Sequence, residues 1–167
     1  MNFELALGEC RFVPTADGKR DVAVSEEYTA DTVEKYFRGD HYAYCRKYFG
    51  EAARLADRGD VNVITHFDLV AKFNKDGKYF DETHPKYVMP ALVAIERLCA
   101  AGKMFEINTD DGVVRPSALL LSSVYELGGK VTFAPDADLE LAKGAAKECG
   151  FDLAYAIADG KLVQTEL

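Results

Sequence analysis

Residues 61–69, VNVITHFDL, decide how we interpret the fold of this chain. The stretch begins with β-favouring and apolar residues and ends with His66 and Asp68 two positions apart. This order is typical of a buried strand that carries polar side chains at its C-terminal end. In α/β folds, chemistry is usually located at that end of a strand. The simpler alternative is that His66 bonds a carbonyl group and Asp68 caps a turn.

Strand-like and helix-like segments alternate on the C-terminal side of this stretch, as far as residue 157. Strands are predicted at 104–109, 130–134 and 151–157, with helices at 85–101, from 116 and after 136. Residues 161–165 are a further candidate strand that could pair after the turn at Asp159-Gly160. Such alternation implies parallel βαβ units with right-handed crossovers. A first strand at 3–13 brings the number to about five, which is few for a closed barrel. The sequence therefore predicts an α/β fold, a partial (β/α) barrel of mainly parallel strands.

Two helices are predicted between the first strand and the central one. Thr29 or Asp31 is suited to cap the first helix, and the second is expected from about Asp40 to Gly59. After the central strand, residues 72–82 are polar and long enough to form a loop over a site.

The composition fits a single domain over residues 1–167. With 49% hydrophobic residues, the chain can bury a sizeable core, and its net charge of −8 disfavours binding to nucleic acid. No apolar run approaches the ~20 residues that span a bilayer, so we expect no membrane association. The four cysteines lack the spacing of a zinc or redox site and are typical of reduced thiols. We therefore expect a cytoplasmic protein.

Acidic residues lie in or after two of the predicted strands. Glu106 has apolar neighbours on both sides, and a carboxylate there is costly to bury unless it meets a cation, a donor or a metal. Asp136 and Asp138 follow the strand at 130–134, where helix capping alone could account for either of them.

Several segments carry a family pattern in the same order along the chain. They are LGECRFV at 7–13, THFDL at 65–69, EINT at 106–109, PS at 116–117 and the strand from Val131 to Asp138. Together they resemble the C-terminal part of histidinol phosphatases of the PHP superfamily, which show G-S-V-H-[YF], G-H-x-D, E-x-N-T, a Pro-Ser helix start and S-D-A-H. The ordered set is more specific than any single motif. The resemblance covers nearly all of this chain and only the later part of the family's.

The resemblance implies a truncated, distorted (β/α)7 barrel in which divalent metals at the strand ends activate a water that attacks a phosphate ester. It would make His66 and Asp136 metal ligands, with Glu106 and Asn108 supporting the pocket. Asp138 is the third candidate ligand, because a carboxylate there could still bind a hard metal. The metal would be a single Zn, Fe, Mn or Mg ion. The alternative is that the chain binds no metal.

The departures from the family pattern concern its metal ligands. The chain has three histidines and no H-x-H, and Arg11 stands where the family has a histidine. A guanidinium cannot coordinate a cation, so we expect Arg11 either to bind an anion or to pair with Glu106, Asp136 or Asp138. Asp138 replaces the family's last histidine. The intact trinuclear cluster therefore cannot be built from one such chain.

Three functional hypotheses follow. The first is a truncated histidinol-phosphatase-like protein with weak or absent activity and unknown catalytic residues. The second is a metal-dependent phosphomonoesterase that uses either a residual site or one completed by another subunit, in which Arg115 holds the phosphate and Asp68 lines the pocket. The third is a non-catalytic interaction protein. In each case exposed barrel edges predict a homodimer, and a small phosphorylated ligand is the other expected partner.

Overall fold

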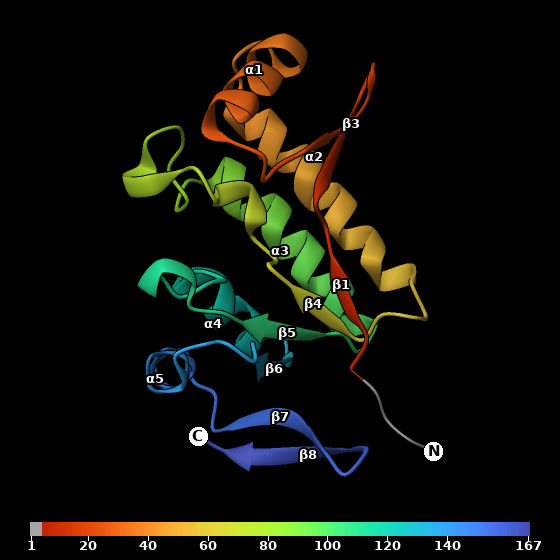
Figure 1. The fold of residues 1–167 in the computed structure, drawn as a ribbon, viewed down its shortest axis with the longest axis vertical. Coiled ribbons are helices and arrows are strands. Elements are labelled where there is room, and N and C mark those ends of the chain that lie inside the picture. Colours follow the sequence, from red (N-terminus) through yellow and green to blue (C-terminus); the bar gives the residue numbers. More distant parts are fainter. Residues whose placement is uncertain (1–4) are drawn as a thin grey trace.

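The computed structural model describes residues 5–167 as an α/β fold built on a four-stranded parallel sheet (Figure 1). The sheet has the order β1-β4-β5-β6, with strands at Leu7–Glu9, Val63–Thr65, Met104–Ile107 and Lys130–Phe133. The helices are α1 (Glu26–Phe37), α2 (His41–Ala53), α3 (Pro85–Ala100), α4 (Ala118–Glu126) and α5 (Leu139–Glu148). The remaining strands form two antiparallel hairpins, β2 (Phe12–Thr15) with β3 (Gly18–Asp21), and β7 (Leu153–Ala158) with β8 (Lys161–Glu166).

The central strands are buried, as their unbroken apolar sequences lead one to expect for a parallel sheet. All residues of β4 and β5 are buried, and Ile64 and Phe105 pair across the two strands within the main core. At the edge, β1 lies close to the turn before β4. A side-chain carbon on Gly8 would lie 2.4 Å from Val61 Cγ1, so only glycine allows this approach.

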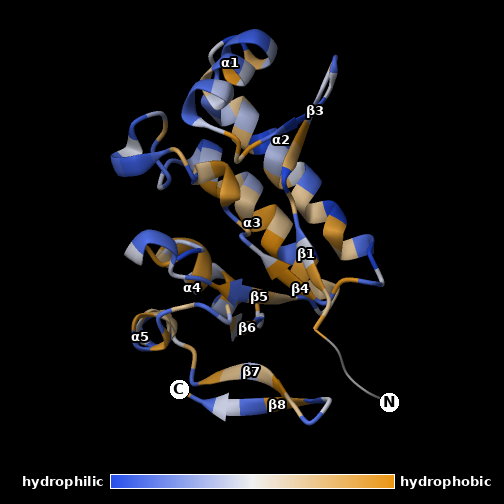
Figure 2. Ribbon diagram, viewed as in Figure 1, coloured by the Kyte–Doolittle hydropathy of each residue, from blue (hydrophilic) through white to orange (hydrophobic). Residues whose placement is uncertain are grey.

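Aromatic side chains between the sheet and the helices fill much of the core. Phe67, which follows β4, packs against Phe49 of α2 and Phe105 of β5 with ring centroids 5.4 Å apart in each case. Figure 2 shows apolar residues concentrated on β4 and α3, whereas the loop that precedes α3 is polar. This packing fixes the end of β4, where the sequence places its candidate histidine.

The structure confirms an α/β fold with a parallel sheet. The strands β4, β5 and β6 lie where the sequence predicts the central strand and the strands at 104–109 and 130–134. No helix within residues 5–167 is long and apolar enough to cross a membrane. The first predicted strand, 3–13, is divided into β1 and part of β2, and residues 1–4 lie outside the described part of the chain.

Two details of the prediction were wrong. The first helix begins earlier than expected, because Ser25 is its N-cap and accepts a hydrogen bond from the backbone of Tyr28. The strand predicted at 151–157 as parallel is β7, which pairs antiparallel with β8 and is not hydrogen-bonded into the four-stranded sheet. The tight turn at Asp159 and Gly160 explains the second difference, since both residues have a positive φ and reverse the chain directly.

Candidate functional site

His66 stands at the C-terminal edge of the parallel sheet, between two carboxylates. Its Nδ1 lies 2.9 Å from Glu9 Oε1, at the end of β1, and its Nε2 lies 3.4 Å from Asp110 Oδ2, in the loop after β5. The first contact is close but does not have hydrogen-bond geometry, since Nδ1 is buried without a hydrogen-bond partner. His66 also has a φ of 45°, so the backbone turns sharply where the strand ends.

Glu106 shares this region from the neighbouring strand, and only 6% of it is exposed. Burial raises the pKa of its carboxyl group, the imidazole of His66 lowers that pKa, and the charges of Asp136, Asp110 and Glu9 raise it further. Glu9, His66, Asp110 and Asp136 therefore all act electrostatically on Glu106. We call these five residues the histidine-carboxylate cluster.

Asn108 follows β5 and is almost completely buried, with 2% of its surface exposed. Its backbone N–H donates to the carbonyl of Arg115 at 2.9 Å, and its carbonyl accepts from Arg115 at 3.0 Å. Its side-chain Oδ1 and Nδ2 are both buried without a hydrogen-bond partner. Because side chains two positions apart on an extended chain point to the same face, Asn108 lies on the face of Glu106.

Arg115 and Asp68 form a separate, more deeply buried ion-pair network. The guanidinium lies 2.9 Å from Asp68 Oδ2 and 2.6 Å from Glu82 Oε2, and the same Asp68 oxygen accepts from the Ser117 backbone at 3.1 Å. Burial raises the pKa of the Asp68 carboxyl group, and the charge and hydrogen bond of Arg115 act against that rise. Arg115 is therefore held by two carboxylates, whereas the sequence suggested it as a phosphate ligand.

Arg11 has partners other than the three carboxylates that the sequence suggested. Its Nε lies 2.7 Å from Asp21 Oδ2, and its Nη1 lies 3.7 Å from Glu9 Oε2. The reason is the β2–β3 hairpin, in which Phe12 pairs with Asp21 and so brings that carboxylate beside Arg11. The hairpin was not predicted, and this ion pair was missed with it.

The two aspartates after β6 differ in what they do. Asp138 is the N-cap of α5, and its Oδ1 accepts from the backbones of Glu140 and Leu141 at 3.1 Å each. Asp136 is exposed and acts on Glu106 through its charge. Among the residues that the structure describes, no three or more His, Cys, Asp or Glu side chains are grouped so as to hold a metal ion. The predicted ligand set of His66, Asp136 and Asp138 therefore stays a prediction.

Sequence reasoning missed Asp21, described above, and three further acidic residues, namely Glu9, Glu82 and Asp110. Glu9 could have been found from the sequence, because it ends an apolar strand directly before a turn. Asp110 reads as part of a surface turn, TDDG, and Glu82 as the end of a polar loop. Neither of these two could be assigned a partner without the fold.

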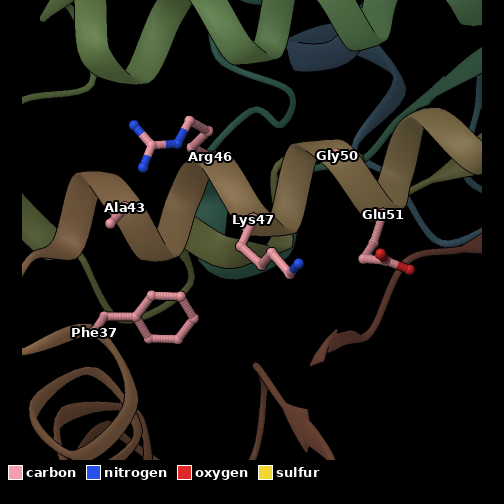
Figure 3. Close-up of a pocket in the computed structure, with 6 residues that line it drawn as sticks. All are labelled: Phe37, Ala43, Arg46, Lys47, Gly50 and Glu51. Carbon is pink, nitrogen blue, oxygen red and sulfur yellow. The ribbon is translucent and has the colours of Figure 1, made fainter. Parts of the chain in front are cut away.

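A groove elsewhere on the molecule does not involve the cluster. It runs along α2 and is lined by Phe37, Ala43, Arg46, Lys47, Gly50 and Glu51 (Figure 3). It opens widely to solvent, and none of the candidate site residues lines it.

Comparison with known structures identifies a similar fold. The structure aligns with a protein from Listeria monocytogenes, provisionally assigned as the histidinol phosphatase hisK, with a TM-score of 0.69 and 14% sequence identity. The alignment covers 80% of this chain and 53% of that protein, so this chain spans about half its length. Comparisons with protein families and with curated proteins give no match. The chain therefore has a fold similar to that of this Listeria monocytogenes protein.

Proposed function

We propose that this chain is a cytoplasmic, histidinol-phosphatase-like protein, a truncated PHP-type barrel whose phosphatase activity is weak or absent. Hydrolysis of a phosphomonoester is among the slowest uncatalysed reactions, so it depends strongly on the metals that activate water and neutralise the phosphate. In this proposal the chain keeps the fold and part of the pocket, and ion pairs stand where metal ions would act.

The observation that carries the proposal is the environment of His66. A histidine that binds a metal gives one ring nitrogen to the ion and uses the other to fix its orientation. Here a carboxylate faces each ring nitrogen, Glu9 at 2.9 Å and Asp110 at 3.4 Å. The two arginines near the pocket are also occupied, Arg11 by Asp21 and Arg115 by Asp68 and Glu82. This leaves a phosphate ester with few cationic partners.

A residual metal site is the second candidate, and the electrostatics of Glu106 favour it. The charges of three neighbouring carboxylates raise the pKa of Glu106, and a divalent cation would relieve that repulsion. His66 and Asp136 would hold the ion, with Glu106 beside them. Asp138 fits less well because its Oδ1 already accepts hydrogen bonds from the backbones of Glu140 and Leu141 at the start of α5. When bound, such an ion would supply a polarised water.

The third candidate is an interaction protein that forms a homodimer through an exposed edge. Within the described residues β1 pairs only with β4, and Leu7 on this edge strand is 57% exposed. Unpaired strand edges invite association with another chain. Light scattering at micromolar concentration tests this directly, and a monomer there would argue against it.

The decisive experiment measures metal content per chain and hydrolysis of histidinol phosphate on the same preparation, purified without chelators or a histidine tag. We expect substoichiometric metal and slow or undetectable hydrolysis. Near-stoichiometric zinc, iron or manganese that disappears in His66→Ala, but not in the control His41→Ala, would instead support the residual metal site. Hydrolysis that disappears with it would overturn the proposal.

A further inference from the structure

We propose that the groove along α2 docks a short acidic segment of a partner protein, one that carries an apolar side chain between its carboxylates. The groove is lined by residues of α2 and by Phe37, the last residue of α1 (Figure 3). None of its residues belongs to the histidine-carboxylate cluster. The inference therefore goes beyond the function proposed above and does not depend on it.

The size of the groove suits a few residues of a peptide. Its volume is about 350 Å³, and its residues on α2 extend from Ala43 to Glu51. At a rise of about 1.5 Å per residue, this part of the helix is roughly 12 Å long. An extended chain covers that length with three to four residues, at about 3.3 Å each.

The charge of the groove determines which segment it attracts. Arg46 and Lys47 are exposed, and neither forms an ion pair or a side-chain hydrogen bond with any residue in 5–167. Glu51, at the far end, already lies 3.4 Å from the guanidinium of Arg54. The whole chain has a net charge of −8, so two neighbouring cations without acidic partners are a local exception. They attract carboxylates, and the overall negative charge disfavours nucleic acid as the occupant.

Phe37 adds an apolar surface next to these charges. Its ring packs edge-on against Tyr44, with ring centroids 5.5 Å apart, so the core holds it in place. Figure 3 shows the ring beside the part of α2 that carries Ala43 and Lys47. Because the ring is only partly buried, an apolar side chain of the occupant can cover its exposed part. This favours a segment in which a residue such as leucine lies between acidic ones.

Gly50 is an observation independent of charge. It lies inside α2, where glycine is less favourable than any residue except proline. A side-chain carbon added there would meet nothing within 4 Å, so the packing of this chain does not require glycine. A partner backbone that lies directly against α2 does require it, since any side chain at this position would hold the partner away.

The experiment measures the fluorescence anisotropy of a fluorescein-labelled peptide, GDELDG, during titration with the full chain at low ionic strength. Two control peptides separate the two kinds of contact, because GNQLNG lacks the charges and GDEGDG lacks the apolar side chain. We expect saturable binding of GDELDG, weaker binding of GDEGDG and no binding of GNQLNG. Added salt should weaken the binding, since the charges that carry it are exposed.

Variants of the full chain locate the binding. Arg46→Gln and Lys47→Gln should each weaken it roughly threefold to fivefold, because each removes one exposed charge pair. Gly50→Leu should abolish it by filling the groove, and should not weaken the fold, because open space surrounds this position. The matched controls on α5 are Lys147→Gln and Gly144→Leu, which should bind as the wild type does. Circular dichroism verifies that every variant is folded.

Several results would overturn the inference. They are the absence of saturable binding up to about 1 mM, equal binding of GDELDG and GNQLNG, and wild-type affinity in both Lys47→Gln and Gly50→Leu. Binding to phosphatidylserine vesicles without binding to the peptide would assign the groove to a membrane surface instead. A dimer that Gly50→Leu disrupts would assign it to a second copy of the chain. Metal content and hydrolysis are measured separately, so each of these failures leaves the proposed function as it is.

Discussion

Replacing Arg115 with methionine should destabilise the fold strongly, because it leaves two carboxylates without their cation. Asp68 has a side chain that is 1% exposed, and Arg115 is its only ion-pair partner among the described residues. Removing one member of a buried ion pair typically costs 3–5 kcal/mol. Arg115 itself is 25% exposed, so we expect the low end, about 3 kcal/mol, measured by urea unfolding. For a chain of this size that corresponds to a fall in Tm of roughly 6–12 °C.

The loss should also depend on pH in a defined direction. Burial raises the pKa of Asp68, and Arg115 opposes that rise, so its removal raises the pKa further. A carboxyl group whose pKa is higher in the folded state than in the unfolded state destabilises the fold when it is ionised, and this penalty fades as the pH falls and the group binds a proton. The destabilisation by Arg115→Met should therefore be largest near neutral pH and should shrink on acidification.

Two further variants make this prediction specific. Adding Asp68→Asn to Arg115→Met removes the unpaired buried charge and should restore part of the stability. The control is Arg97→Met, whose ion pair with Asp57 is on the surface and should contribute less than about 1 kcal/mol. The reasoning is refuted if Arg115→Met costs no more than Arg97→Met and its effect does not change with pH.

Three other predictions concern single positions. Gly8→Ala should lower the free energy of unfolding in urea by about 1–3 kcal/mol, because the added carbon would clash with Val61. Gly59→Ala is the control, since there is open space around Gly59. Equal losses in the two variants would contradict the close approach of β1. Asp138→Ala should cost about 1 kcal/mol through loss of the cap of α5, and its cost should not depend on added metal; a cost that appears only with metal would point to a ligand role. Burial raises the pKa of Cys10 to about 12, so a thiol reagent at pH 8 should modify this thiol only as fast as the protein unfolds. Peptide mass spectrometry measures the rate of labelling. Rapid labelling of the folded protein would contradict this prediction.

The fold was predictable where the local sequence indicates which residues are buried. The unbroken apolar runs of β4 and β5 and the helical spacing between them predict parallel βαβ units, and the structure has them. The direction of β7 was not predictable from its own residues, because a buried strand after a helix looks the same in either direction. The turn at Asp159-Gly160, after which residues 161–165 were a candidate strand, was the better guide, because a tight turn there favours an antiparallel hairpin.

The candidate site was predictable in its location but not in its pairing. Glu106 was identified because a carboxylate among apolar strand residues is costly to bury without a partner. His66 was identified because it ends a predicted strand, and Asn108 because the family resemblance implies a place for it in the pocket. Which carboxylate faces which cation depends on loops, and these are set by tertiary contacts. Thus Arg11 meets Asp21 only because a hairpin follows β1, and Arg115 meets Glu82 only because the long loop before α3 returns to it.

The order of the four-stranded sheet has a consequence for how the chain folds as it is synthesised. Each strand from β4 onward pairs with the sheet strand that precedes it in the chain, and none has to insert between two strands that are already joined. A growing chain can therefore add β4 to β1, then β5, then β6, and bury each connecting helix as it arrives. At each stage the sheet has two unpaired edges, β1 and the strand that was added last.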